Sequence, residues 1–144
     1  MRRQEKPDRS PCWKIRDQRR FLIAAMTELA GNARLSLEGN LSATKVLNLA
    51  GASVDETSIL KRNTTWPKQE FVVLPLEADL IQAIIAGIGG TVPRGILHIQ
   101  IEKSGHLELG LYDNFEPSAS FFGPRLPPEF LGRLEAEGIL KQMT

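Results

Sequence analysis

The stretch that most constrains the fold is GILHIQIEKSGHLELGLYDNF, which runs from Gly95 to Phe115. Apolar and polar residues alternate on both sides of Ser104-Gly105, which is the pattern of two antiparallel strands joined by a tight turn. Side chains in a strand point alternately to opposite faces, so one face of this hairpin is apolar. The sequence therefore predicts a sheet with a hydrophobic core against one of its faces.

The length of the turn decides which residues of the hairpin pair. A two-residue turn, Ser104-Gly105, would place Ile101 opposite Glu108, and apolar residues would meet polar ones along the whole hairpin. A three-residue loop, 103–105, instead pairs Ile101 with Leu107 and keeps the apolar residues together, so we predict this longer loop. The opposite face then carries four side chains around Gly110: His98, Gln100, Glu108 and Tyr112.

An antiparallel sheet with helices on one side commonly exposes its other side to water, so we predict that this polar face is solvated. Two alternatives stay open. The face could contact another protein, or it could hold a ligand-binding or catalytic site beside the gap left by Gly110. The candidate ligand-binding residues are His98, Gln100, Glu108 and Tyr112.

The remaining chain adds helices and strands in mixed order. Helical periodicity predicts helices over about 17–30, 77–90 and 127–138, and alternation predicts strands over 33–39 and 70–77. Residues 40–68 are the least readable part: SATKVLNLAG could form a short helix or a strand, and a helical turn is possible around Ile59 and Leu60. A chain of 144 residues is long enough to bury one core. We therefore predict an α+β domain, with an antiparallel or mixed sheet of about four strands and about three helices packed mainly on one face.

Charge is unevenly distributed along the chain. Residues 1–20 contain eight basic and three acidic side chains, although the whole chain has a net charge of only +1. We predict a flexible basic segment over 1–20, with Trp13 and Ile15 as the first residues suited to ordered structure, and a single domain over 21–144. The basic segment could contact phosphate groups weakly, but no wider nucleic-acid binding is expected.

The sequence lacks the residues that several kinds of functional site require. One cysteine and two histidines cannot supply the four ligands of a usual structural zinc site, and no metal or cofactor is expected. The sequence GIGG follows a predicted helix, whereas a phosphate-binding loop precedes one. No apolar run has the roughly 20 residues of a membrane span. A lone thiol, Cys12, suits a reducing compartment, so the protein is expected in the cytoplasm. An enzymatic role is not favoured, because the sequence carries no recognisable catalytic motif.

The loop YDNFEPSASFF gathers aromatic residues among turn-forming ones. Two or three of its phenylalanines should pack over the end of the sheet, and any that is exposed could anchor a partner, because aromatic side chains often dominate binding to a protein. The sequence therefore predicts a small protein-binding module, and a bacterial inhibitor or immunity-type protein is one form of it. The alternative is a small-molecule-binding protein or small enzyme that uses His98, Glu108 and Tyr112. Self-association and the partner's identity stay open. The candidate partner-binding residues are Phe115, Phe121 and Phe122.

Overall fold

The computed structural model describes residues 12–143, and the α+β fold predicted from the sequence is confirmed. The helices are α1 (Gln18–Leu29), α2 (Ile81–Ile88) and α3 (Pro128–Ala136), with short 3-10 turns η1 (Val46–Asn48), η2 (Ala78–Leu80) and η3 (Pro117–Ala119). The strands are β1 (Cys12–Ile15), β2 (Ala33–Gly39), β3 (Glu70–Leu76), β4 (Ile96–Lys103), β5 (His106–Leu111), β6 (Phe121–Phe122) and β7 (Leu140–Met143).

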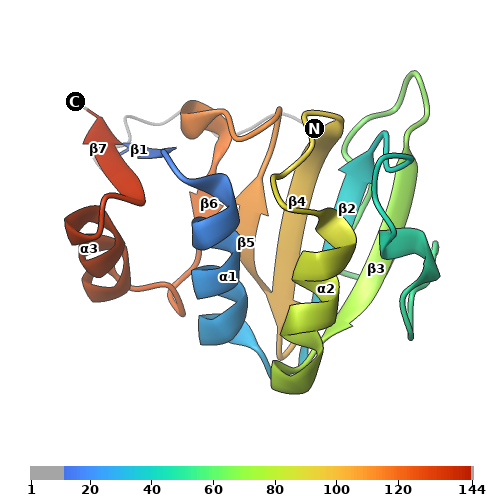
Figure 1. Cartoon of the computed structure of the whole chain (residues 1–144), viewed down its shortest axis with the longest axis horizontal. Helices are drawn as coiled ribbons and strands as arrows, with labels where there is room; N and C mark the ends of the chain where they lie inside the picture. The colour runs from blue at the N-terminus through green and yellow to red at the C-terminus, as the bar shows by residue number, and fades with distance from the viewer. Residues whose placement is uncertain (1–11, 144) are drawn as a thin grey trace.

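Five of the strands form one antiparallel sheet in the order β3-β2-β4-β5-β6, one strand more than the sequence indicated. The additional strand, β6, is only two residues long and continues the sheet beyond the predicted hairpin. The remaining two strands, β1 and β7, form a separate two-stranded sheet at the side of the molecule (Figure 1). No helix within residues 12–143 is long and apolar enough to cross a membrane.

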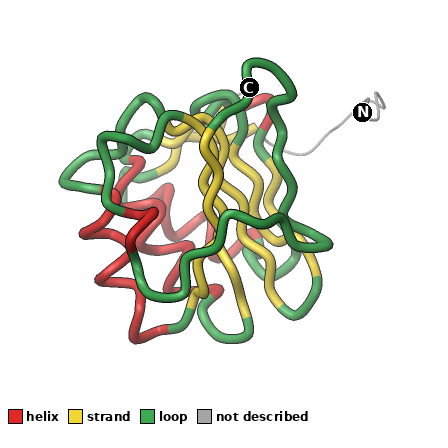
Figure 2. Tube along the Cα trace, turned by 90° about the vertical axis from the view of Figure 1, so that its right-hand side faces the viewer, coloured by secondary structure: helices red, strands yellow, loops and turns green. Residues whose placement is uncertain are grey.

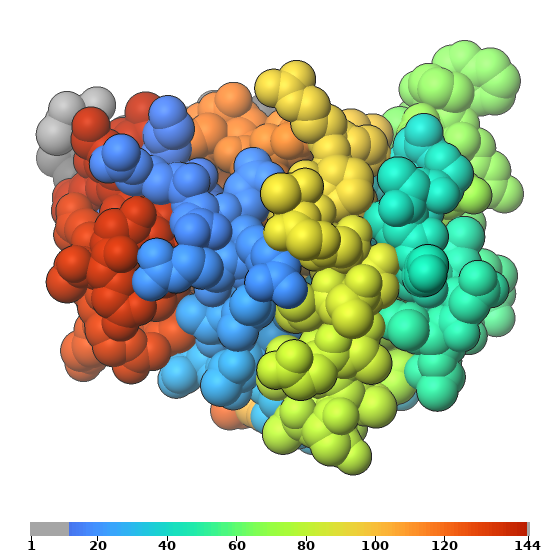
Figure 3. Space-filling view, in the orientation of Figure 1, coloured from blue at the N-terminus to red at the C-terminus, as the bar shows by residue number. Residues whose placement is uncertain are grey.

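The helices lie on one face of the sheet, which we call the front face, and loops cover the other, the back face (Figure 2). In the space-filling view α3, α1 and α2 lie side by side over the front of the molecule (Figure 3). The apolar residues predicted to face the core are buried there, because the pleat directs alternate side chains of each strand toward the helices. The innermost side chains include Leu35, Leu37, Ile99, Ile101 and Leu109 from the sheet, and Phe21, Met26, Ile84 and Ile85 from the helices.

The ordered fold includes residues 12–20, which the charge pattern assigned to the flexible basic segment. Trp13 and Ile15 are 8% and 7% exposed and belong to the main core, and the β1 that carries them pairs with β7. The intervening residue Lys14 is exposed, so the positive charge lies on the outer face of a short strand whose inner face is apolar. Residues 1–11, the rest of that predicted segment, lie outside the described residues.

The hairpin has a two-residue turn, not the predicted three-residue loop. Ser104 and Gly105 have φ angles of 52° and 84°, the left-handed values of a type I′ turn. Glu102 pairs with Leu107, but Ile101 pairs with Leu109, so Glu108 is an extra residue on β5. This bulge shifts the alternation by one residue and brings the apolar side chains together again. The prediction failed because it assumed regular pairing along the whole hairpin.

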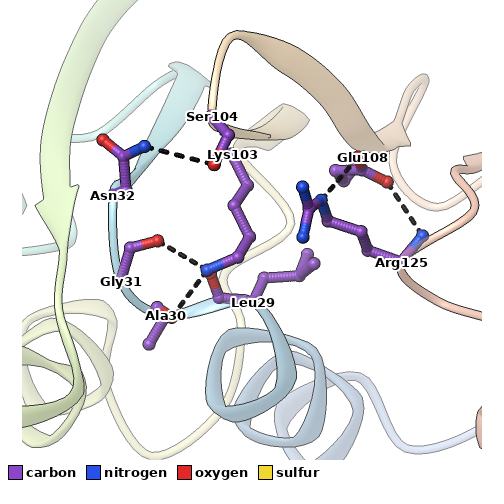
Figure 4. Close-up of polar contacts among 8 residues, drawn as sticks. All are labelled: Leu29, Ala30, Gly31, Asn32, Lys103, Ser104, Glu108 and Arg125. Atoms are coloured by element: carbon purple, nitrogen blue, oxygen red, sulfur yellow. Dashed lines mark hydrogen bonds and ion pairs between the residues drawn. The ribbon is translucent and has the colours of Figure 1, made fainter.

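Lys103 ties the hairpin to the end of α1 (Figure 4). Its Nζ donates hydrogen bonds to the carbonyl oxygens of Leu29 and Ala30, at 3.0 and 2.9 Å, and to that of Gly31. These carbonyls have no partner within the helix, and they lie at the negative end of its dipole, where a cation is stabilising. The contact fixes the position of α1 relative to the sheet.

Candidate functional site

The polar face predicted to be solvated is buried. Residues 53–69, which we call the covering segment, cross the back face without regular helix or strand, and Leu60 packs there against Phe71 and Val73 in a second, smaller core. The prediction of an open face was wrong because the unreadable part of the sequence supplies a third layer. The polar residues beneath or beside this layer are at most 8% exposed: Ser36, Glu38, His98, Gln100, Glu102 and Glu108.

Glu38 holds the covering segment to β2. Its side chain accepts hydrogen bonds from the backbone amides of Asn63, at 2.7 Å, and Thr64, at 3.1 Å. The residue is only 1% exposed, and a carboxylate in that setting is stabilised by the donors that it binds. Glu38 was not among the predicted site residues. A carboxylate on a short strand looked like part of a wet face, and its partners come from the segment without a pattern.

His98, the cross-strand neighbour of Glu38, links two different loops. Its Nδ1 accepts a hydrogen bond from the amide of Asp113 at 3.2 Å, and its Nε2 lies 2.8 Å from Oγ1 of Thr64. A backbone amide can only donate, so Nδ1 carries no proton in this arrangement. His98 is therefore neutral, with its proton on Nε2 and directed to the threonine hydroxyl.

Gln100 is held in the same way. Its side-chain amide donates to Oγ of Ser36, at 3.1 Å, and to the carbonyl of Lys61, at 2.9 Å, while its oxygen accepts from the hydroxyl of Tyr112 at 3.2 Å. Tyr112 lies over Gly110, where an added Cβ would be 2.5 Å from the tyrosine hydroxyl. The gap at Gly110 is thus filled by the protein's own side chain.

Glu108 makes its contacts elsewhere, at the bulge next to β6. Its carboxylate accepts from the amide of Arg125 at 3.1 Å and lies 3.4 Å from that residue's Nε (Figure 4). Gly123 passes so close that a Cβ there would clash with the Glu108 carboxylate oxygen. The structure therefore connects His98, Gln100 and Tyr112 through the polar face, and places Glu108 as the anchor of the loop after β6.

The three predicted partner-binding phenylalanines have different surroundings. Phe115 is 8% exposed, and Phe122 packs edge-on against Phe21 in the main core, with ring centroids 6.0 Å apart. Phe121 is 42% exposed. A second exposed aromatic residue, Trp66, has 85% of its surface free. Its sequence signal was a tryptophan before proline, in a segment with no apolar periodicity to bury it.

A series of contacts and strand pairings links the two exposed aromatic residues, Trp66 and Phe121, to the half-buried Tyr112. Trp66 is two residues from Thr64, which contacts His98, and the His98 ring is 5.8 Å from the ring of Tyr112. Tyr112 covers Gly110, and Gly110 pairs with Phe121 across β5 and β6. We call Trp66, Tyr112 and Phe121 the aromatic surface.

Two hollows in the surface of the protein lie away from the aromatic surface. One of about 770 Å³ is lined by Arg34, Asp55, Glu56, Glu77 and Glu102, among others. The other, of about 500 Å³, is lined by Arg16, Arg19 and Arg20 around the start of α1, whose N-cap is already filled by Asp17. Within residues 12–143 no group of three or more His, Cys, Asp or Glu residues is placed to hold a metal ion.

Comparison with known proteins does not identify a function for this arrangement. No protein-family model, no curated protein and no solved structure matches the chain. The case for a function therefore rests on the geometry of the back face.

Proposed function

We propose that this protein is a protein-binding module and that the aromatic surface, Trp66, Tyr112 and Phe121, is its contact site. The observation that carries the proposal is the exposure of Trp66, which is 85% free on the covering segment. Large aromatic side chains contribute much of the binding energy in protein interfaces, and tryptophan is enriched among the residues that dominate it.

The covering segment is held in place before any partner arrives. Glu38 binds two of its amides, His98 contacts Thr64, and Gln100 binds the carbonyl of Lys61. A loop that is already ordered loses less conformational entropy on binding, so more of the contact energy remains as affinity. The buried polar network thus supports a binding role by fixing the segment that carries Trp66.

A small-molecule site around His98, Glu108 and Tyr112 has less support. Tyr112 fills the space over Gly110, and the polar atoms of His98 and Glu108 have partners within the chain. A binding module needs only a rigid and complementary surface. An inhibitor or immunity-type protein, which acts by occupying its partner, is one form that such a module takes.

The proposal is tested by replacing the exposed aromatic residues one at a time. The wild-type protein and the variants Trp66→Ala and Phe121→Ala are immobilised and exposed to lysate of the source cell, and captured proteins are quantified by mass spectrometry. Val54→Ala is the control, because Val54 is 61% exposed on the same covering segment and lies outside the aromatic surface. Thermal unfolding confirms that each variant is folded.

We expect one protein to be retained by the wild type and Val54→Ala, and its affinity to fall at least about tenfold with Trp66→Ala, the loss typical of a dominant interface residue. The purified partner is then titrated by calorimetry to confirm the difference. Equal binding by Trp66→Ala and the wild type would rule out this surface as the contact site. The absence of any saturable partner would count against the function itself.

A further inference from the structure

The turn after β5 has a backbone conformation that few residues adopt. Asp113, Asn114 and Phe115 have φ angles of 53°, 61° and 64°, three left-handed residues in succession and none of them glycine. Aspartate and asparagine tolerate this region, but a bulky side chain such as phenylalanine rarely occupies it. Such a turn persists only where its surroundings hold it.

The contacts that hold this turn around the start of β4 include a hydrogen bond from the side-chain amide of Asn114 to the carbonyl oxygen of Arg94. The amide of Asp113 donates to Nδ1 of His98, the amide of Asn114 donates to the carbonyl of Leu97 at 2.8 Å, and the ring of Phe115 is buried in the main core. The bond to His98 differs from the other contacts, because its acceptor exists only while the imidazole is neutral. A proton on Nδ1 would place two N–H groups against each other.

We propose that His98 makes this turn sensitive to acid. Neutral His98 holds the amide of Asp113, whereas protonated His98 releases that amide and loosens the backbone that follows Tyr112, while the hydroxyl of Tyr112 keeps its bond to Gln100. The turn responds to a proton that binds His98, and the segment that loosens is the one that follows β5.

The groups around His98 confine the effect of protonation to the contact between Nδ1 and the turn after β5. Nε2 donates to Thr64 in both protonation states, so its contact with the covering segment survives. The charged and titratable neighbours are Glu38, which is opposite on β2 with its carboxylate bound to two amides, and Tyr112 and Asp113 from the end of β5. On the covering segment the guanidinium of Arg62 lies over Phe71, and Lys61 is exposed. Trp66 therefore stays fixed while the backbone after Tyr112 loosens.

The experiment is amide hydrogen exchange followed by NMR on the full chain, from about pH 8 to about pH 5, the interval in which histidines change charge. Rates are corrected for their intrinsic pH dependence. The ring signals of His106, an exposed histidine on the same hairpin, are followed in the same samples for comparison with those of His98. The amides of Asn63 and Thr64, which Glu38 holds, are the internal controls.

We expect the corrected exchange rate of the Asp113 amide to rise about tenfold as His98 becomes protonated, which corresponds to the loss of one hydrogen bond. The rates at Asn63 and Thr64 should stay unchanged. In His98→Gln, whose neutral side chain offers both a donor and an acceptor, the rise should disappear. In Asp113→Asn it should persist, because the carboxylate of Asp113 has no part in it.

Three results would overturn the inference. They are an Asp113 amide that stays protected while His98 titrates, a rise of equal size in His98→Gln, and the loss of the rise in Asp113→Asn. If His98→Gln does not fold, the wild type and Asp113→Asn still decide the question. A weaker partner affinity in acid would follow only if the proposed function is right. The exchange experiment and the partner search can give different answers. If the Asp113 amide is released in acid but no partner depends on Trp66, the acid sensitivity of the turn stands and the proposed binding function is rejected.

Discussion

Individual residues of the back face stabilise this protein through hydrogen bonds that water would otherwise supply. Gln100 shows this most directly, because its amide group is bonded to Ser36, Lys61 and Tyr112. We expect Gln100→Ala to lower the free energy of unfolding by about 1–3 kcal/mol, since it leaves buried partners unsatisfied. Urea denaturation monitored by circular dichroism measures the change.

Gln82→Ala is the control for this substitution, because Gln82 is exposed on α2 and should alter stability by less than about 0.5 kcal/mol. Similar values for the two variants would mean that Gln100 is exposed to water in solution. A loss below about 0.5 kcal/mol for Gln100→Ala is also what the solvated polar face predicted from the sequence would give.

Among the elements of the fold, the β4–β5 turn depends most clearly on a single backbone angle. Gly105 has a φ of 84°, and a Cβ there would touch nothing, so strain alone opposes a substitution. Gly132 in α3 has the same open surroundings, with a helical backbone. We expect Gly105→Ala to destabilise the protein by about 1–2 kcal/mol and Gly132→Ala to stabilise it by up to about 1 kcal/mol. Thermal unfolding of the two variants should therefore shift in opposite directions; a shared direction would contradict the type I′ turn.

The elements also show how far the sequence leads. Periodicity identified the helices, β2, β3 and the hairpin, because each buries one face against the core and carries the matching pattern. It missed the bulge at Glu108, since one extra residue leaves the alternation intact on both sides of it. It missed the covering segment as well. Contacts such as those of Glu38 with Asn63 and Thr64 join distant parts of the chain through polar atoms, and polar contacts of this kind leave no periodic pattern.

For the molecule as a whole, the small β1–β7 sheet extends the main core beyond the five-stranded sheet. Trp13 contributes the largest side chain of β1 and is 8% exposed. We expect Trp13→Ala to cost about 3–5 kcal/mol, the usual range for removing a buried aromatic side chain. Met143→Ala, on β7 with 43% of the residue exposed, should cost far less. Denaturant unfolding that separates the two variants by less than about 1 kcal/mol would show that β1 is peripheral to the core.

The pairing of β1 with β7 also bears on how the chain reaches its folded state. Cys12 lies opposite Met143, so this sheet joins the two ends of the described chain and cannot form until the whole length between them is brought together. Closing so large a loop is entropically costly, and contacts between distant residues slow folding. The β4–β5 hairpin, whose partners are neighbours in the sequence, is expected to form early, and β1 with β7 last. A circular permutant in which a short linker joins these two strands would turn the slowest closure into a local one.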